Sequence, residues 1–288
     1  MTSTDAPPLN IPNTRHRAPT VMEGFSRASA SRQSRGLLAL SLALTLSACG
    51  PQKFPQTKPA SWTEPDPSKI PATPEGDSIR AGRLIFHQTP RYAASFVGNK
   101  LSCTDCHVRG GLEPYASPMV GMPGIFPMYN TRAKKVISLE DRVQECFTRS
   151  ENGHPLQYNG PEMIAVVSYI HWLSIGQTDG KPFPGRGFVK LPALEGDPAK
   201  GQKIYADKCA SCHGSDGAGQ PPILPALWGP DSYNDGAGMD QLPKMAAFVQ
   251  HNMPQNHPGT LTAQESYDVA AYVHTKPRPK FNQDYAGY

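Results

Sequence analysis

The sequence of 288 residues lacks three patterns that are typical of other classes of protein. No stretch of useful length alternates polar and apolar residues, so the sequence predicts an all-α fold. The apolar stretch at residues 36–46 is too short to cross a bilayer comfortably. Five of the 28 basic residues but only two of the 24 acidic ones lie in residues 1–48, which leaves 23 basic against 22 acidic side chains. That balance offers no basic surface for binding nucleic acid.

Residues 1–48 have the layout of the signal peptide of an exported protein. Arg27, Arg32 and Arg35 lie shortly before the apolar stretch, and Leu46-Ser-Ala-Cys49 stands at its end. This tetrapeptide resembles a bacterial lipobox, in which Cys49 becomes the lipidated first residue of the mature protein; ordinary cleavage nearby is the alternative. We therefore expect a periplasmic protein whose membrane contact is a lipid anchor at Cys49.

Two copies of Cys-x-x-Cys-His carry the strongest chemical signal. They are Cys103-Thr-Asp-Cys106-His107 and Cys209-Ala-Ser-Cys212-His213. Two thiols can bond to the vinyl groups of haem, and the adjoining imidazole can take one axial position of its iron. A zinc site would not require a His after each pair, and a thioredoxin-like pair would be single within a βαβ unit. The motifs predict two covalently bound haem c groups.

The organisation of the chain fits two cytochrome c-like haem domains joined by a Gly/Pro-rich linker. Each half has the same order of elements: a first helix, a haem motif, a long loop, a ligand-bearing segment and a closing helix. We expect Asp77 and Asp197 to cap the first helices. The predicted parts are a proline-rich tether at 49–75, a catalytic domain at 76–180, a linker at 181–196 and an electron-transfer domain at 197–288.

Met253 is the predicted second iron ligand of the second haem. It lies 40 residues after His213, and Pro254 ends the helix predicted over residues 244–250. A methionine on the extended segment beyond that helix can place its sulfur over the open haem face. A thioether ligand raises the reduction potential and suits a haem from which electrons leave. The competing ligands are Met239, Met245 and His251.

Cys146 is the predicted second ligand of the first haem, because it lies 39 residues after His107. One cysteine belongs to the lipobox and four to the haem motifs, so Cys146 has no cysteine left with which to pair. A helix predicted from Ser138 to Asn152-Gly153 places Cys146 on its buried stripe. A thiolate ligand lowers the potential, and its sulfur is a nucleophile when it is off the metal. The alternatives are a small core residue at this position, or ligation by Met119, Met122, Met128, His87 or His154.

Cationic and hydroxyl groups surround Cys146 in the sequence. Arg142 and Ser150 lie four residues before and after it on the predicted helix, and Arg132 lies upstream. Such donors suit an anion that bears sulfonate oxygens. Each arginine taken alone is better explained by a solvated helix charge or by pairing with a haem propionate; it is their clustering around the thiol that favours an anion site.

These residues resemble the TsdA-type dihaem thiosulfate dehydrogenases. The match includes Leu139-Glu-Asp-Arg-Val-Gln-Glu-Cys-Phe-Thr-Arg-Ser150 and Asn152-Gly-His-Pro-Leu156. It also runs through residues 97–107, 126–129, 162–163 and 168–173. The resemblance is specific over residues 76–180 and is that of a general cytochrome c beyond them.

The resemblance implies that two thiosulfates are coupled to tetrathionate with release of two electrons, a reaction that some members run mainly in reverse. Cys146 would leave the iron and carry a thiosulfate adduct, which a second thiosulfate attacks. Arg132, Arg142 and Ser150 would hold the substrate, and the haems of His107 and His213 would pass electrons to a periplasmic carrier such as a small cytochrome c. Asn252 stands where some relatives have a lysine beside the methionine ligand, which argues against a ligand exchange through that position.

Two other functions remain open at the level of sequence. One is a non-enzymatic dihaem electron-transfer cytochrome, in which Cys146 is a core residue. The other is a SoxA-like subunit, which also uses a cysteine-ligated haem but acts with a partner cytochrome and a carrier protein. The Asn-Gly-His-Pro segment and the self-contained second motif favour the dehydrogenase.

Overall fold

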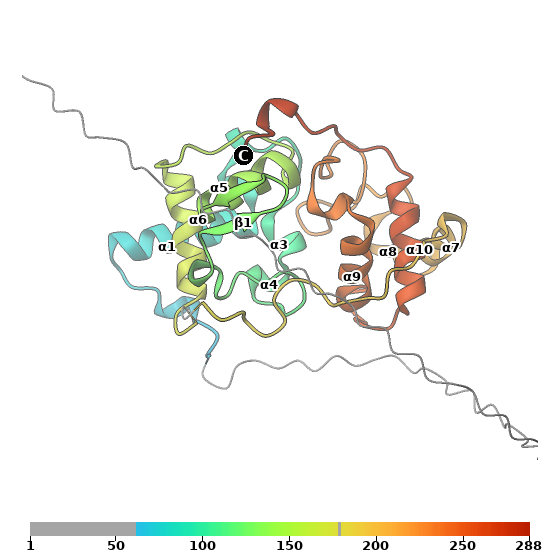
Figure 1. Ribbon diagram of the computed structural model, residues 1–288, viewed down its shortest axis with the longest axis horizontal. Coiled ribbons are helices and arrows are strands. Elements are labelled where there is room, and N and C mark those ends of the chain that lie inside the picture. The colour runs from blue at the N-terminus through green and yellow to red at the C-terminus, as the bar shows by residue number, and fades with distance from the viewer. Residues whose placement is uncertain (1–61, 178–179) are drawn as a thin grey trace, which may run out of the picture. The chain divides into compact units, whose positions relative to one another are not determined.

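The computed structural model describes residues 62–177 and 180–288, which belong to one compact unit at 49–288 (Figure 1). The predicted signal peptide at 1–48, the anchor residue Cys49 and the tether up to residue 61 lie outside the described residues. Within the described parts of the chain, no helix has both the length and the apolar character needed to cross a membrane.

The first half, up to residue 177, consists of short helices around one long pair, with a small hairpin. Its elements in chain order are η1 (Pro67–Lys69), α1 (Pro74–His87), α2 (Thr89–Tyr92), η2 (Ala94–Phe96), α3 (Cys103–Cys106), α4 (Val108–Gly111), η3 (Met122–Gly124), β1 (Met128–Asn130), β2 (Lys135–Ile137), α5 (Leu139–Glu145), the π-helix η4 (Cys146–Ser150) and α6 (Pro161–Leu173).

The second half repeats the helical order of the first without the hairpin. Its elements are α7 (Pro198–Lys208), α8 (Ala210–His213), η5 (Gly238–Asp240), α9 (Leu242–Asn252), α10 (Ala263–His274) and η6 (Gln283–Tyr285).

One helix crossing occurs in both halves and depends on a glycine in each. Helix α1 packs against α6, and α7 packs against α10 (Figure 1). A Cβ added at Gly82 would lie 1.9 Å from the carbonyl oxygen of Ala165, and one added at Gly201 would lie 1.9 Å from that of Asp268. Only glycine lets the two backbones approach this closely. The shared crossing agrees with the repeated order of elements expected from the sequence.

Most of the expected helix starts are present, and one is wrong. Asp197 caps α7, where its Oδ1 accepts hydrogen bonds from the backbone N–H groups of Ala199 and Lys200. Asp77, however, does not cap the first helix. The N-cap of α1 is Thr73, four residues before Asp77, and proline occupies the first helical position. Asp77 instead lies in the first turn.

The all-α prediction misses the antiparallel hairpin of β1 and β2, in which Tyr129 pairs with Val136. Each strand has only three residues, which is too short to produce a recognisable alternation. The turn between them is fixed by the Asn130 side chain, whose Oδ1 accepts from the N–H groups of Arg132 and Ala133 at 2.9 and 3.1 Å. The hairpin therefore determines where Arg132 lies.

Parts of the predicted tether and of the predicted linker pack against the first half of the chain, through Trp62 and Phe183. Trp62, within the tether, is 5% exposed, and its ring makes an edge contact with Phe183 of the linker at 5.2 Å. Its indole N–H donates to the carbonyl oxygen of Leu173. Proline content marked these segments as extended, but their aromatic side chains provide enough apolar area to hold them on the surface.

Candidate functional site

The first Cys-x-x-Cys-His motif lies on α3 and at the residue that follows it. One helical turn separates Cys103 from Cys106, so both thiols face the same side. The turn is held at its start, where the backbone N–H of Ser102 donates to Asp105 Oδ2 at 2.8 Å. Both thiols and the His107 ring line one cavity.

Both motif histidines are oriented in the same way. His107 Nδ1 lies 2.7 Å from the carbonyl oxygen of Ser117, and His213 Nδ1 lies 3.0 Å from that of Pro225. A carbonyl at Nδ1 fixes the tautomer and leaves Nε2 to act as a metal ligand. Burial lowers the pKa of His107 to about 4 and also lowers that of His213, which keeps both rings neutral. The thiols and ring nitrogens therefore fit covalently held haem at both motifs.

The predicted linker supports the loop that orients His107. The N–H groups of Tyr115 and Ser117 donate to the carbonyl oxygens of Gly185 and Gly187 at 2.6 and 2.8 Å. These two bonds hold the loop on either side of Ala116, which is fully buried. This arrangement could not be predicted from the sequence, because Gly185 and Gly187 resemble ordinary linker glycines.

The cavity of the first motif brings together most of the predicted site. Its lining includes Cys146, Arg142 and Ser150 as well as Cys103, Cys106 and His107. Of the competing ligands, Met119 and Met122 line the same cavity, whereas Met128, His87 and His154 do not. His154 instead lies 2.7 Å from the hydroxyl oxygen of Tyr285.

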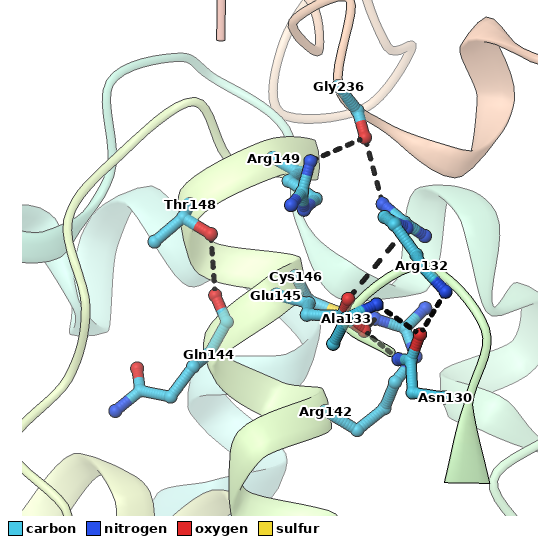
Figure 2. A network of polar contacts seen from close by, with 10 residues as sticks. All are labelled: Asn130, Arg132, Ala133, Arg142, Gln144, Glu145, Cys146, Thr148, Arg149 and Gly236. Carbon is cyan, nitrogen blue, oxygen red and sulfur yellow. Dashed lines mark hydrogen bonds and ion pairs between the residues drawn. The ribbon is translucent and has the colours of Figure 1, made fainter. Parts of the chain in front are cut away.

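Cys146 lies at the point where the helix changes its hydrogen bonding. Helix α5 begins at a capping box formed by Ser138 and Asp141 and ends at Glu145, and the π-helix η4 starts at Cys146. Arg142 Nη1 lies 3.5 Å from Cys146 Sγ (Figure 2). Burial raises the pKa of the Cys146 thiol, and the Arg142 guanidinium acts in the opposite direction by stabilising the thiolate.

Glu145 joins the two predicted arginines, and the sequence reasoning missed it. Its side chain is 1% exposed. Its Oε2 accepts from Asn130 Nδ2 at 3.0 Å and pairs with Arg142 Nη1 at 3.2 Å, and its Oε1 lies 3.8 Å from Arg132 Nε (Figure 2). Arg132 is therefore tied to the site through Glu145 and does not line the cavity itself. The i, i+3 spacing of Arg142 and Glu145 was the available signal.

Two further titratable groups near Cys146 were not expected. Glu151 is buried and lines the cavity, and burial raises the pKa of its carboxyl group. Lys244 of α9 has a lowered pKa because it is partly buried and close to the positive charges of Arg132 and Arg142. The second half of the chain thus adds positive charge beside the predicted anion site.

The second motif borders a cavity of about 1050 Å³. Cys209, Cys212, His213 and Met253 line it together, as do Met239 and Met245; His251 does not. Helix α9 ends at Asn252, and Met253 follows in extended conformation, as the sequence predicts. The Asn252 side chain donates to the carbonyl oxygen of Phe248 at 3.0 Å and to that of Tyr115 at 3.3 Å.

The two cavities are neighbours. Leu101 and Cys106 line both of them. Cys106 of the first motif therefore also borders the cavity of the second motif.

The repeated helix crossing and the paired cavities define this chain as a c-type cytochrome, and the comparisons agree. Residues 91–178 match the family described as SoxA/TsdA, cytochrome c domain. Residues 196–273 match the family described as cytochrome C oxidase, cbb3-type, subunit III. Two cytochrome c domains imply haem c as the cofactor and support haem over the zinc and thioredoxin-like alternatives.

Comparison with whole proteins identifies the family. The thiosulfate dehydrogenase of Stutzerimonas stutzeri is 40% identical over 227 residues, which cover 76% of this chain and 74% of that protein. The thiosulfate dehydrogenase of Allochromatium vinosum is 39% identical over 232 residues, which cover 77% and 86%. The structure of thiosulfate dehydrogenase (TsdBA) from Marichromatium purpuratum in its as-isolated form matches with a TM-score of 0.71 and 36% identity, covering 76% of this chain and 50% of that one. This chain belongs to the thiosulfate dehydrogenase family.

Proposed function

We propose that this protein couples two thiosulfate ions to tetrathionate at the cavity of the first motif and releases two electrons. One observation carries the proposal: the Cys146 sulfur shares a cavity wall with Cys103, Cys106 and His107, and the Arg142 guanidinium lies 3.5 Å from it. A cation beside a sulfur nucleophile both attracts an anionic substrate and stabilises the thiolate. The same groups serve the reverse reaction, the cleavage of tetrathionate.

The cofactors of this proposal are two haem c groups. When bound, they accept the two electrons singly and pass them on, with potentials set by their axial ligands. Cys103 and Cys106 would hold the first haem through thioether bonds, and Cys209 and Cys212 would hold the second. His107 with Cys146, and His213 with Met253, would be the ligands of the two irons.

The proposed chemistry takes place at the Cys146 sulfur. Its thiolate forms a sulfur–sulfur bond with the sulfane sulfur of the first thiosulfate, and this oxidation releases two electrons. The second thiosulfate then attacks the sulfane sulfur of the adduct. That attack forms the central bond of tetrathionate, breaks the bond to Cys146 and restores the thiolate without further electron release.

Substrate binding is assigned to Arg142, Arg132 and Ser150. Arg142 and Ser150 line the cavity, and the Arg142 guanidinium supplies donors in a planar fork that suits sulfonate oxygens. Arg132, which is joined to the site through Glu145, would contribute through its positive charge. Glu145 pairs with both arginines and so fixes their positions relative to the sulfur. Lys244 adds to the local positive potential.

Electrons are proposed to leave through the second domain. Leu101 and Cys106 line both cavities, which supports a short path between the haem groups. From the second domain a small periplasmic cytochrome c would accept the electrons. Export by the signal peptide and lipid attachment at Cys49 would keep the protein in the periplasm, at a membrane surface.

Activity of the purified chain tests the proposed function. With both haems attached and no partner subunit, we expect thiosulfate to reduce ferricyanide, with one tetrathionate formed for every two ferricyanide ions. A simple electron-transfer cytochrome would show no reduction that depends on thiosulfate. A SoxA-like subunit would need its partner and a carrier protein. Failure of the purified chain to form tetrathionate contradicts the proposal.

A further inference from the structure

The C-terminal end of the π-helix η4 is completed by groups from outside the helix. The last carbonyl groups of a helix have no partner within it. Phe147 O accepts from the N–H of Gly153 at 2.9 Å, which lies just beyond the helix. Thr148 O accepts from Asn234 Nδ2 at 2.9 Å, and Ser150 O accepts from Asn99 Nδ2 at 2.8 Å.

Hydrogen bonds made by both polar groups of its side chain and by its backbone N–H hold Asn234 in this position. Its side-chain amide also donates to Asn152 Oδ1 at 3.0 Å, its backbone N–H donates to Arg149 O at 3.2 Å, and its Oδ1 accepts from the N–H of Gly236 at 3.1 Å. The residue is 1% exposed. Since a carboxylate of the same shape cannot donate, the two donations from Nδ2 require an amide.

The segment that carries Asn234 also accepts hydrogen bonds from two arginines, Arg132 and Arg149. We call residues 232–236 the capping segment; it belongs to the second cytochrome c domain. The Gly236 carbonyl oxygen accepts from Arg132 Nη1 at 2.9 Å and from Arg149 Nη1 at 3.3 Å (Figure 2). At the other end of the segment, the Ser232 carbonyl accepts from Asn99 Nδ2 at 3.1 Å.

A π turn needs such support more than an α turn does. It contains one residue more than an α turn and is rare, occurring mostly at functional sites. Relaxation to α-helical hydrogen bonding would rotate the residues after the turn by about 100° relative to those before it. The residues after the turn are held by residues 96–98, through hydrogen bonds from the N–H of Gly98 to Glu151 O and from the N–H of His154 to Phe96 O. The rotation would therefore fall on the residues before the turn, where Cys146 lies.

We infer that the capping segment of the second domain positions Cys146, and that Asn234 is the positioning residue. Asn234 acts through the carbonyl groups of Thr148 and Arg149 and touches neither the sulfur nor the substrate. The inference rests on the proposed role of Cys146 as ligand and nucleophile. It makes the first haem site dependent on the second domain for its geometry.

The experiment is low-temperature EPR of the oxidised dihaem protein and of its Asn234→Ala and Asn234→Asp variants. The readout is the low-spin signal of a thiolate-ligated haem. We expect both variants to keep two attached haems but to lose at least about half of this signal to other species, while the signal of the second haem is unchanged. Asn234→Asp should resemble Asn234→Ala, because the lost amide donor is what matters.

Ser266→Ala is the matched control. Ser266 is a fully buried residue of the same domain, and its hydroxyl donates only to the Thr262 carbonyl, at 2.9 Å. We expect this variant to melt at a lower temperature with its EPR spectrum unchanged. Should the Asn234 variants not fold, Asn99→Ala removes the neighbouring cap at Ser150 and is expected to cause the same loss of signal.

The outcomes separate this inference from the proposed function. If the wild-type protein shows the thiolate signal and the cap variants keep it in full, Asn234 is only structural and the inference is wrong. If the wild-type protein lacks the signal, the ligation by Cys146 fails, and the inference fails with it.

Discussion

Cys146 lies among groups that act on its sulfur in opposite directions. Burial raises the pKa of the thiol, and the Arg142 guanidinium favours the thiolate. The buried Glu145 carboxylate offsets part of that positive charge because it pairs with Arg142 at 3.2 Å. One guanidinium, held by one carboxylate, is therefore the group in direct contact with the proposed nucleophile.

Replacing Arg142 tests this balance. Arg142→Gln removes the charge beside the sulfur, and we expect kcat/KM for thiosulfate to fall about 10- to 100-fold, the usual worth of a hydrogen bond to a charged group. Arg142→Lys keeps the charge but lacks the planar fork, so its kcat/KM should lie between those of the wild type and of Arg142→Gln. Steady-state reduction of ferricyanide measures the effect. The control is Arg80→Gln on α1, an exposed arginine that pairs with Asp77; equal activities of Arg142→Gln and Arg80→Gln would contradict the assigned role.

At the scale of elements, the π-helix η4 is held at both ends. Helix α5 enters it from the Ser138 capping box. Beyond it the chain runs beside residues 96–98, where the N–H of Gly98 donates to Glu151 O and that of His154 donates to Phe96 O. The Asn-Gly-His-Pro segment of the sequence thus has a structural role, in which Asn152 adopts a left-handed conformation at φ 47° and Gly153 permits the close approach of two backbones.

Gly153→Ala is expected to disturb this approach. The added Cβ would lie 1.9 Å from the Phe96 carbonyl oxygen, a backbone atom that cannot move alone. Overpacking of this kind costs about 1–3 kcal/mol, so we expect a clear fall in the midpoint of thermal unfolding. Gly238→Ala is the control, because nothing lies within 4 Å of its added Cβ. Equal midpoints of thermal unfolding for Gly153→Ala and Gly238→Ala would contradict this prediction, because they would show that the backbone around residue 153 accommodates the added Cβ.

At the scale of the whole molecule, the two cytochrome c domains offer unlike candidate ligands for the iron. The first cavity offers a cysteine beside cations, and the second offers Met253 on the extended segment after α9. A thiolate ligand lowers a haem potential and a thioether raises it, so this pairing favours electron flow from the first domain to the second.

Met253→Ala separates chemistry from electron exit. We expect the potential of the second haem to fall, and steady-state turnover with it, while one addition of thiosulfate still reduces the first haem. Potentiometric titration and stopped-flow absorbance measure the two effects. Met239→Ala, which removes another methionine from the same cavity, should change neither. A lowered potential in Met239→Ala but not in Met253→Ala would reassign the ligand.

Sequence periodicity and motif spacing were sufficient to predict the features of this molecule that depend on residues close together in the chain, but not those that depend on distant residues. The two motifs indicated where both cavities lie, and Pro254 correctly predicted that Met253 follows the end of a helix. Both features depend on short stretches of sequence. The π-helix was not foreseen, since its stabilising partners Asn99 and Asn234 lie 51 and 86 residues away from the carbonyl groups they bind. Glu145 was missed for the same reason: its partner Arg132 is positioned by a hairpin too short to be recognised.

The role of Cys146 is tested most directly by its replacement with alanine in the protein that carries both haems. Tetrathionate formed from thiosulfate is the quantity to measure, beside a haem determination that shows both groups attached. Because the sulfur is assigned as the nucleophile, we predict a loss of activity on the order of 10³-fold or more. A Cys146→Ala protein that forms tetrathionate at a rate close to that of the wild type would contradict the assignment.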